Sequence, residues 1–213
     1  MLELDLNEQL DGTANVDHLL RDARWPKLRV LRLRGVNCRA PELTRFLIAH
    51  PNLEELALAQ MMPGHAWTQL ELPSDALPNL RHLECSSAQA AALLKDSDSF
   101  RRPLETLLGI EVHDNVVDSR YFSWDDDWED EDHDDPDEER PSPWKTLFLE
   151  GLKAQHSITR LGVASISSPQ EMETLSAVAP QVKEIEIRTE HDFKITVRLN
   201  CSHIYHQHRV DAY

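Results

Sequence analysis

The chain has 213 residues, of which 40% are hydrophobic, and a formal net charge of −16. This length and composition suit one extended domain with a continuous core, and the sequence holds no apolar run long enough to span a membrane. Nucleic acid is not an expected ligand, because phosphate binding needs clustered Lys and Arg and the one dense basic patch comprises Arg29, Arg32 and Arg34.

A short phrase of apolar residues recurs along the chain: an apolar residue, two positions, a second apolar residue, one position, a third. The first copy is Met1-Leu4-Leu6, and the second, 27 residues later, is Leu28-Leu31-Leu33. Further copies are Leu53-Leu56-Leu58, Leu80-Leu83-Cys85, Leu107-Ile110-Val112, Ile158-Leu161-Val163 and Val182-Ile185-Ile187. The copy at Leu107 is placed there because it lies 27 residues after Leu80. A period of this length predicts stacked units, each with one short strand and one return helix.

The phrase begins at Met1 without a polar cap before it. The sequence therefore predicts a truncated first unit with exposed apolar surface and an exposed strand edge. We expect an upstream part of a longer protein to cover this edge, with a partner or self-association as the alternative, and the oligomeric state stays open.

Segments with helical periodicity lie between the strand phrases, and several open with a capping signal. Ser86 with Gln89 predicts a capping box, and Ser168-Pro169 with Glu171 combines an N-cap with a proline at the first helical position. Helices are also predicted to start near residues 15, 41 and 142. Prolines at positions 26, 51, 78 and 180 precede strand phrases, so we expect helices to end before them.

Residues 118–143 interrupt the period, and removing these 26 residues from the 51 between Leu107 and Ile158 leaves 25, which restores it. The stretch from Trp124 to Glu139 contains twelve acids, so 26 acids against 22 bases remain elsewhere and the strong acidity is local. Like charges at this density predict a disordered loop. The loop could bind a basic protein such as a histone, or it could be a solvating insertion without a role. Its candidate residues are Trp124, Asp125, Asp126, Asp127, Trp128, Glu129 and Asp130.

After the last copy of the phrase, the alternation from Phe193 to Leu199 predicts a strand that folds back as an antiparallel hairpin and caps the stack. The predicted organisation is a set of repeats over residues 1–117, an acidic disordered insertion over 118–143, repeats and the capping hairpin over 144–200, and a tail over 201–213. The predicted fold class is α/β, with parallel strands on a concave face and helices on a convex face.

Residues that alternate with the phrase residues are expected on the concave face, where a partner could bind. The candidates are Arg32, Arg34, Glu55, His82, Glu84, Glu111, His113, Arg160, Glu184, Glu186 and Arg188. Such a mixture of charges suits a polar protein-binding surface, and it equally suits a plain solvated face of a sheet.

No pattern in the sequence points to catalysis. A Gly-rich phosphate loop, a Gly-x-Ser-x-Gly elbow and a His-Glu-x-x-His motif are all missing, so we expect neither an enzyme nor a cofactor. The C-terminal tail carries Cys201, His203, His206 and His208, which could hold zinc or copper, but their spacing matches no standard finger and a frayed tail is the favoured interpretation. Three separated cysteines and the lack of a leader segment predict an intracellular protein, cytoplasmic or nuclear, with reduced thiols.

The phrases RVLRLRG, LEELALA, LRHLECS and VKEIEIR resemble the leucine-rich-repeat half of F-box proteins, in particular the irregular ones of fungi. The resemblance implies a solenoid that holds a protein to be ubiquitinated, whereas residues 1–27 show no F-box that would dock onto a cullin-type ligase. The Asn or Cys of a regular repeat is replaced here by Val36, Met61, Ala88, Ile166 and Glu190, which predicts an irregular solenoid without an asparagine ladder. The expected function is a non-catalytic protein-protein interaction module, and the alternative is an acidic chaperone for basic proteins.

Overall fold

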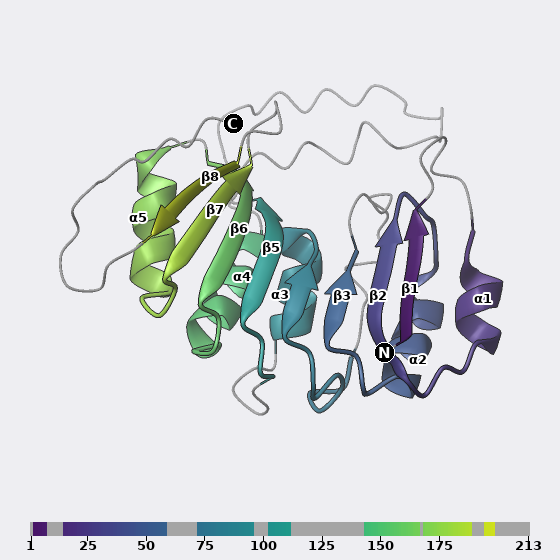
Figure 1. Cartoon of the computed structure of the whole chain (residues 1–213). Helices are drawn as coiled ribbons and strands as arrows, with labels where there is room; N and C mark the ends of the chain where they lie inside the picture. Colours follow the sequence, from purple (N-terminus) through teal and green to yellow (C-terminus); the bar gives the residue numbers. More distant parts are fainter. Residues whose placement is uncertain are drawn as a thin grey trace, which may run out of the picture.

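The computed structural model describes residues 2–7, 15–58, 72–95, 102–111, 143–166, 168–188 and 194–198. Within these residues the chain forms eight strands and five helices in a mixed α/β arrangement (Figure 1). The strands are β1 (Leu2–Asn7), β2 (Leu28–Arg34), β3 (Glu55–Ala57), β4 (His82–Glu84), β5 (Thr106–Glu111), β6 (Arg160–Ser165), β7 (Glu184–Arg188) and β8 (Lys194–Arg198). The helices are α1 (Asp17–Asp22), α2 (Ala40–Ala49), α3 (Ser87–Leu94), α4 (Pro143–Ala154) and α5 (Pro169–Val178).

All eight strands belong to one open sheet whose spatial order follows the chain from β1 to β8. Strands β1 to β7 pair in parallel, and β8 pairs antiparallel with β7. The five helices form a single layer behind the sheet (Figure 1), so one face of the sheet is covered and the other carries no helix of the described residues. The predicted α/β class and the parallel strands are therefore confirmed. The residues that would form the predicted hairpin turn, 189–193, lie outside the described part, and the hairpin stays a prediction.

The middle residue of each phrase lies in one continuous row across the sheet. Each member pairs in register with the next, and the row consists of Leu4, Leu31, Leu56, Leu83, Leu107, Leu161 and Ile185. All of them except the partly buried Leu4 are nearly inaccessible to solvent and belong to one core between sheet and helices. Because strand residues alternate between two faces, this row fixes which side chains point to the core and which point away from the helices.

The prediction of the phrase Leu107-Ile110-Val112 is wrong, because its first residue is in fact the second residue of the phrase. Leu107 pairs with Leu83 and Leu161, so it is the middle residue of its phrase and not the first. The first residue is Leu104, which is 0% exposed. The third is Ile110, which stands opposite Val163 across a register shift in β5. Gly109, with a φ of +80°, lies within this shift, and the extra residue is accommodated as a β-bulge.

The turns that lead into five of the strands share one backbone hydrogen bond. In the turn before β2, the N–H of Leu28 donates to the carbonyl oxygen of Trp25 at 2.9 Å, with Pro26 between them. The equivalent bond occurs before β3, β4, β6 and β7. Proline suits the second position of such a turn because its ring presets φ. The prolines at positions 26, 51, 78 and 180 thus do more than end helices, since they shape the turns before β2, β3, β4 and β7, whereas the turn before β6 has His156 at this position.

Side-chain amides link three of these turns, those before β3, β4 and β7, to the turn of the preceding unit. Nδ2 of Asn52 donates to the carbonyl oxygen of Pro26 at 3.1 Å, and Nδ2 of Asn79 donates to that of Pro51 at 3.2 Å. A glutamine amide before β7 bonds in the same way to the turn before β6, at 3.0 Å. The position at which a regular repeat has Asn holds other residues in this chain. Amide side chains in the turns before the strands donate instead to backbone carbonyls of the neighbouring unit.

The capping signals locate two helix starts correctly. Ser86 and Gln89 form the predicted capping box of α3, and the side chain of Ser168 accepts a bond from the N–H of Glu171 at the start of α5. Among the described residues, no helix has both the length and the apolar character needed to cross a membrane.

Candidate functional site

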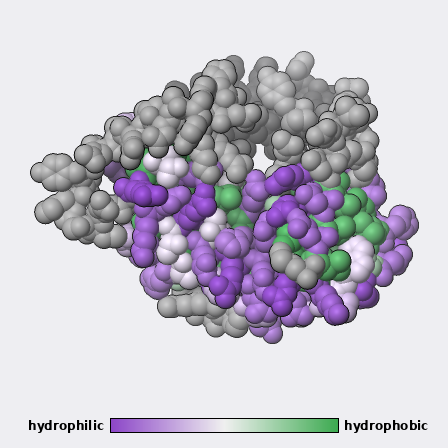
Figure 2. Space-filling model, viewed as in Figure 1, coloured by the Kyte–Doolittle hydropathy of each residue, from purple (hydrophilic) through white to green (hydrophobic). Residues whose placement is uncertain are grey.

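We call the sheet face without helices the open face. Two rows of side chains run across it, one on each side of the buried leucine row. Row A consists of Glu3, Val30, Glu55, His82, Thr106, Arg160, Glu184 and Arg198. Row B consists of Asp5, Arg32, Ala57, Glu84, Leu108, Gly162, Glu186 and Thr196. In Figure 2, which shows this face, hydrophilic residues dominate the middle of the described surface.

The structure brings most of the predicted face residues into these rows, while others fall elsewhere. Arg34 stands one step further along β2. Glu111 pairs with Ser165 beyond the bulge and belongs to neither row. Arg188 stands opposite Lys194 in the register of β7 and β8. His113, the acidic loop residues 124–130 and the tail residues 201–208 lie outside the described part of the chain.

Several members of the rows were not predicted from the sequence. Thr106 and Leu108 occupy the positions that the misplaced phrase had assigned to later residues of β5. Glu3 and Asp5 could have been found, since the copy at Met1-Leu4-Leu6 predicts that the residues between its leucines alternate to the open face. Arg198 becomes a member only through the antiparallel pairing of β8 with β7.

The first charged cluster of the open face is centred on Arg32. Its Nε donates to Oε1 of Glu55 at 2.8 Å, its Nη1 forms an ion pair with Glu3, and Asp5 lies 3.9 Å away. The hydrogen bond to Glu55 is the main reason that the pKa of Arg32 is raised above its ordinary value, and the carboxylates of Glu3 and Asp5 add to it. Val30 lies between Glu3 and Glu55 in row A and is only 1% exposed.

A second contact crosses a whole strand. Nη2 of Arg34 on β2 lies 3.3 Å from Oε2 of Glu84 on β4, although strands two places apart are separated by about 10 Å. Ala57 occupies row B on the intervening β3 between Arg32 and Glu84. Its small side chain leaves the space above β3 through which the two long side chains reach each other.

The second charged cluster is centred on Arg160. Its Nη2 donates to Oε2 of Glu186 at 2.7 Å, and its Nε lies 3.4 Å from Oε1 of Glu184. The Glu186 side chain is only 2% exposed, so this carboxylate is held in a dry environment that requires a charged partner. Gly162 stands beside Glu186 in row B, and a Cβ atom there would lie 2.5 Å from Cδ2 of Leu108. The glycine thus makes room for the leucine side chain to lie across β6.

These contacts make the open face largely self-neutralised. The three arginines on β2 and β6 that lie on it each contact at least one carboxylate from another strand. His82, near the centre of row A, is exposed. Arg198, at the β8 end of the same row, is also exposed and forms no ion pair within the described residues. The face therefore offers a patterned polar surface with small residues at Ala57 and Gly162, and not a strong field of one sign.

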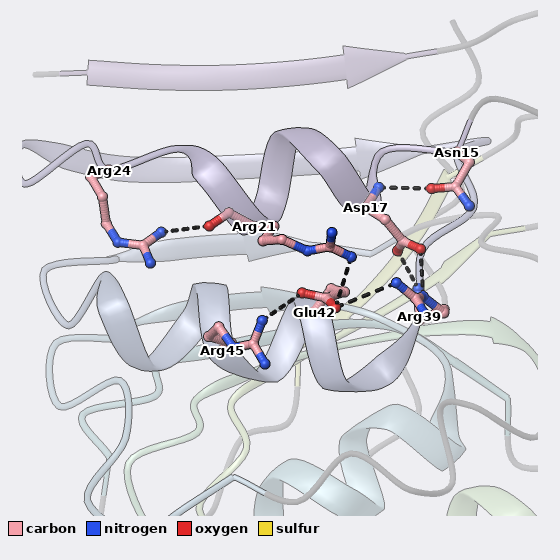
Figure 3. A network of polar contacts seen from close by, with 7 residues as sticks. All are labelled: Asn15, Asp17, Arg21, Arg24, Arg39, Glu42 and Arg45. Atoms are coloured by element: carbon pink, nitrogen blue, oxygen red, sulfur yellow. Dashed lines mark hydrogen bonds and ion pairs between the residues drawn. The ribbon is translucent and has the colours of Figure 1, made fainter.

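A third charged cluster lies in the helix layer and joins α1 to α2 (Figure 3). Asp17 accepts from the backbone N–H of Arg39 at 2.8 Å and from its Nε at 2.6 Å. Glu42 lies within 3.4 Å of nitrogens of Arg21, Arg39 and Arg45. Burial would raise the pKa of Asp17, but the hydrogen bonds from Arg39 outweigh it and the pKa lies below its ordinary value. The pairs Arg39–Asp17 and Arg21–Glu42 cross between the two helices, so this cluster holds α1 and α2 together.

The described residues include no group of three or more His, Cys, Asp or Glu side chains placed to hold a metal ion. Cys38 and Cys85 are buried free thiols. Burial raises the pKa of Cys38 to about 12 and raises that of Cys85 further above its ordinary range. Thiols of this kind stay protonated and are poor nucleophiles.

Models of known protein families and curated protein sequences gave no match to this chain.

Proposed function

We propose that the chain is a non-catalytic protein-interaction module, built as an irregular leucine-rich-repeat solenoid, which holds a partner protein on the open face. The observation that carries this proposal is the pair of mostly polar rows across eight strands, on the one sheet face that no described helix covers. The spatial order that follows the chain, with the leucines of successive phrases in register, supports the repeat architecture.

The geometry favours a partner whose own charges are complementary to several side chains of the open face at once. Because Arg32, Arg34 and Arg160 already contact carboxylates, a partner gains little from a single opposite charge. It gains more by matching several charges of both signs along a row, which fixes register and orientation. The exposed His82, between Glu55 and Thr106, lies at the centre of this pattern. A partner segment lying across the strands would pass over it.

A photo-crosslinking amino acid in place of His82 tests this proposal directly. The matched control carries the same group in place of Lys153, an exposed residue of α4 in the helix layer. A protein captured at position 82 and not at position 153, which then binds the purified chain, supports the proposal. The triple variant Arg32→Glu, Glu55→Arg, Glu184→Arg should lose that binding while its circular dichroism spectrum stays native. Identical capture at both positions would leave the open face as a solvated surface.

A narrower form of the proposal makes the bound protein a ubiquitination substrate. It is supported only by the resemblance of the strand phrases to the repeat half of F-box proteins. In cells, the captured partner should then accumulate and lose ubiquitin conjugates when this protein is depleted. An unchanged half-life of the partner removes the ligase role and leaves the binding role intact.

The second candidate function is capture of basic proteins by the acidic stretch, which is favoured by its twelve carboxylates between Trp124 and Glu139. Charge at this density attracts polycations over distances comparable with the Debye length. Deletion of residues 125–139 should abolish histone binding at low salt. Undiminished binding by the deletion variant would eliminate this candidate.

A further inference from the structure

The two outer strands of the sheet have unpaired edges in the described part of the chain. β1 pairs only with β2, and β8 pairs only with β7. An exposed edge presents a row of backbone N–H and C=O groups that can pair with another chain. Proteins commonly protect such edges, so the chemistry of these two strands decides what each could accept.

The β1 edge is acidic on one face and apolar on the other. Glu3 and Asp5 are exposed on the open face, while Leu4 and Leu6 face the helices and are only partly buried. Leu2 is 41% exposed at the start of the strand, and Leu19 on the neighbouring α1 is 37% exposed. Figure 2 shows apolar surface gathered at this end of the molecule, near β1 and α1.

The β8 edge has the opposite charge and the same apolar side. Arg198 is exposed on the open face, and Thr196 lies next to it in row B. Ile195 and Val197 pair with the helix-facing Ile187 and Ile185, yet both keep part of their surface exposed. Each outer strand therefore presents apolar side chains at alternate positions toward the helix side, with acids between them on β1 and a base on β8.

We propose that the chain associates head to tail, with β8 of one copy pairing antiparallel with β1 of a second copy. The register that continues rows A and B places Arg198 opposite Glu3 and Thr196 opposite Asp5 of the second copy. The same register places Val197 opposite Leu4 and Ile195 opposite Leu6. The antiparallel direction repeats the relation of β8 to β7, so both copies keep their open faces on the same side.

Charge excludes the symmetric alternatives. An antiparallel pair of two β1 strands would place the acids at positions 3 and 5 against each other, and like charges directly opposite destabilise a strand pair. Two paired β8 strands would oppose Arg198 with Lys194. The heterologous pair removes both conflicts, and Glu3 can then lie between Arg32 of its own chain and Arg198 of the neighbour. A heterologous interface generates a ring or an open-ended stack, in which the open faces join into one longer surface.

Sedimentation velocity of the full chain at low salt, over a wide range of concentration, tests this inference. We expect assembly that grows with concentration and weakens with salt. Arg198→Glu and Glu3→Arg should each raise the dissociation constant about tenfold, since each turns an attractive cross-strand pair into a repulsive one. A mixture of the two variants should recover assembly, because the reversed charge on β8 of one variant then meets the reversed charge on β1 of the other. Lys153→Glu on α4 is the control for charge reversal and should assemble as the wild type does.

Two results would overturn the inference. One is a chain that stays monomeric at every concentration, and the other is assembly that Arg198→Glu leaves unchanged while Glu3→Arg strengthens it, which would indicate a symmetric β1 contact. Hydrogen exchange of the wild type removes any dependence on how the variants fold. Amides of both β1 and β8 should gain protection as concentration rises, and protection confined to one of them, or to neither, contradicts the proposed pairing.

Discussion

The bulge in β5 depends on Gly109, and replacing this residue with alanine is the sharpest test of the strand register. Gly109 has a φ of +80°, in the region that L side chains rarely adopt. A Cβ atom there would stand 3.0 Å from the carbonyl oxygen of Cys85, the residue that follows β4. That neighbour is backbone held in the sheet, since the N–H of Cys85 donates to the carbonyl oxygen of Leu108 at 3.0 Å. It cannot withdraw as a flexible side chain would.

The expected loss of stability for Gly109→Ala has two parts. The left-handed conformation costs a residue with a Cβ atom about 1–2 kcal/mol relative to glycine. The close approach to Cys85 adds about 1–2 kcal/mol, in the range of small overpacking effects. Together they predict a free energy of unfolding lower by about 2–4 kcal/mol, a large share of the stability of an ordinary domain.

Urea unfolding followed by tryptophan fluorescence and far-ultraviolet circular dichroism gives the magnitude. Gly35→Ala is the matched control, because Gly35 follows β2 with a φ of +64° and so isolates the conformational part. The control should lose about 1–2 kcal/mol. If Gly109→Ala is no less stable than the control, the close contact with Cys85 is not felt. If it is as stable as the wild type, the bulge and the corrected phrase that depends on it are both refuted.

Three further variants probe the core and its buried polar groups. Leu104→Ala, at a fully buried position, should lower the unfolding free energy by about 2–5 kcal/mol in the same urea assay. Arg102→Met should cost about 3 kcal/mol, because the buried guanidinium donates to backbone carbonyls that would lose their partner; a thermal midpoint unchanged from the wild type would contradict this. His50 accepts from the N–H of Trp25 through Nε2 and donates from Nδ1 to the carbonyl of Phe46, and burial lowers its pKa below 6.5. As pH falls, this histidine is therefore protonated at a higher pH in the unfolded state than in the folded state. The free energy of unfolding should then decrease below pH 6.5 by at most about 1.4 kcal/mol per pH unit. His50→Gln should show a shallower fall in urea titrations at pH 7 and pH 5, and an equal fall would refute the assignment.

The sequence predicted the sheet as far as its periodicity is regular. Leu31, Leu56 and Leu83 lie in adjacent, parallel strands, as the phrase spacing requires. This success has a physical basis, because a residue that must be buried in every unit repeats at the same place in every unit. Prolines and the two serine caps were equally readable, since each acts on its own few residues.

The misplaced phrase in β5 shows where periodicity fails. Leu104, Leu107 and Ile110 are spaced by three and three, whereas the phrase has three and two. The extra residue is tolerated because Gly109 can bulge, and a bulge is a property of the strand pair and not of one strand. A distance count from Leu80 placed the phrase three residues late, and this error removed Thr106 and Leu108 from the predicted face.

Interactions between strands were the least predictable part of the candidate site. The sequence identified Arg32, Arg160 and Glu186 as face residues, but nothing local indicates that Glu186 is buried or that Arg160 supplies its partner. Those contacts join residues about two dozen positions apart, and their geometry depends on side-chain packing above the sheet. The amide links between turns were missed for the same reason, since Asn79 reads as a turn residue until its neighbour is placed beside it.

Salt dependence separates the three binding modes that the chain could use. On the open face most charges are already paired within the molecule, so adding salt removes little net attraction for a partner. The acidic stretch carries twelve carboxylates with no base among them, and its attraction for a polycation should collapse once the Debye length shortens to about 8 Å near physiological ionic strength. Pairing of β8 with β1 combines one exposed charge pair with backbone bonds and apolar contacts, and should weaken only moderately. A partner of the open face whose affinity falls as steeply with salt as that of a histone would show that the acidic stretch, and not the sheet, provides the binding energy.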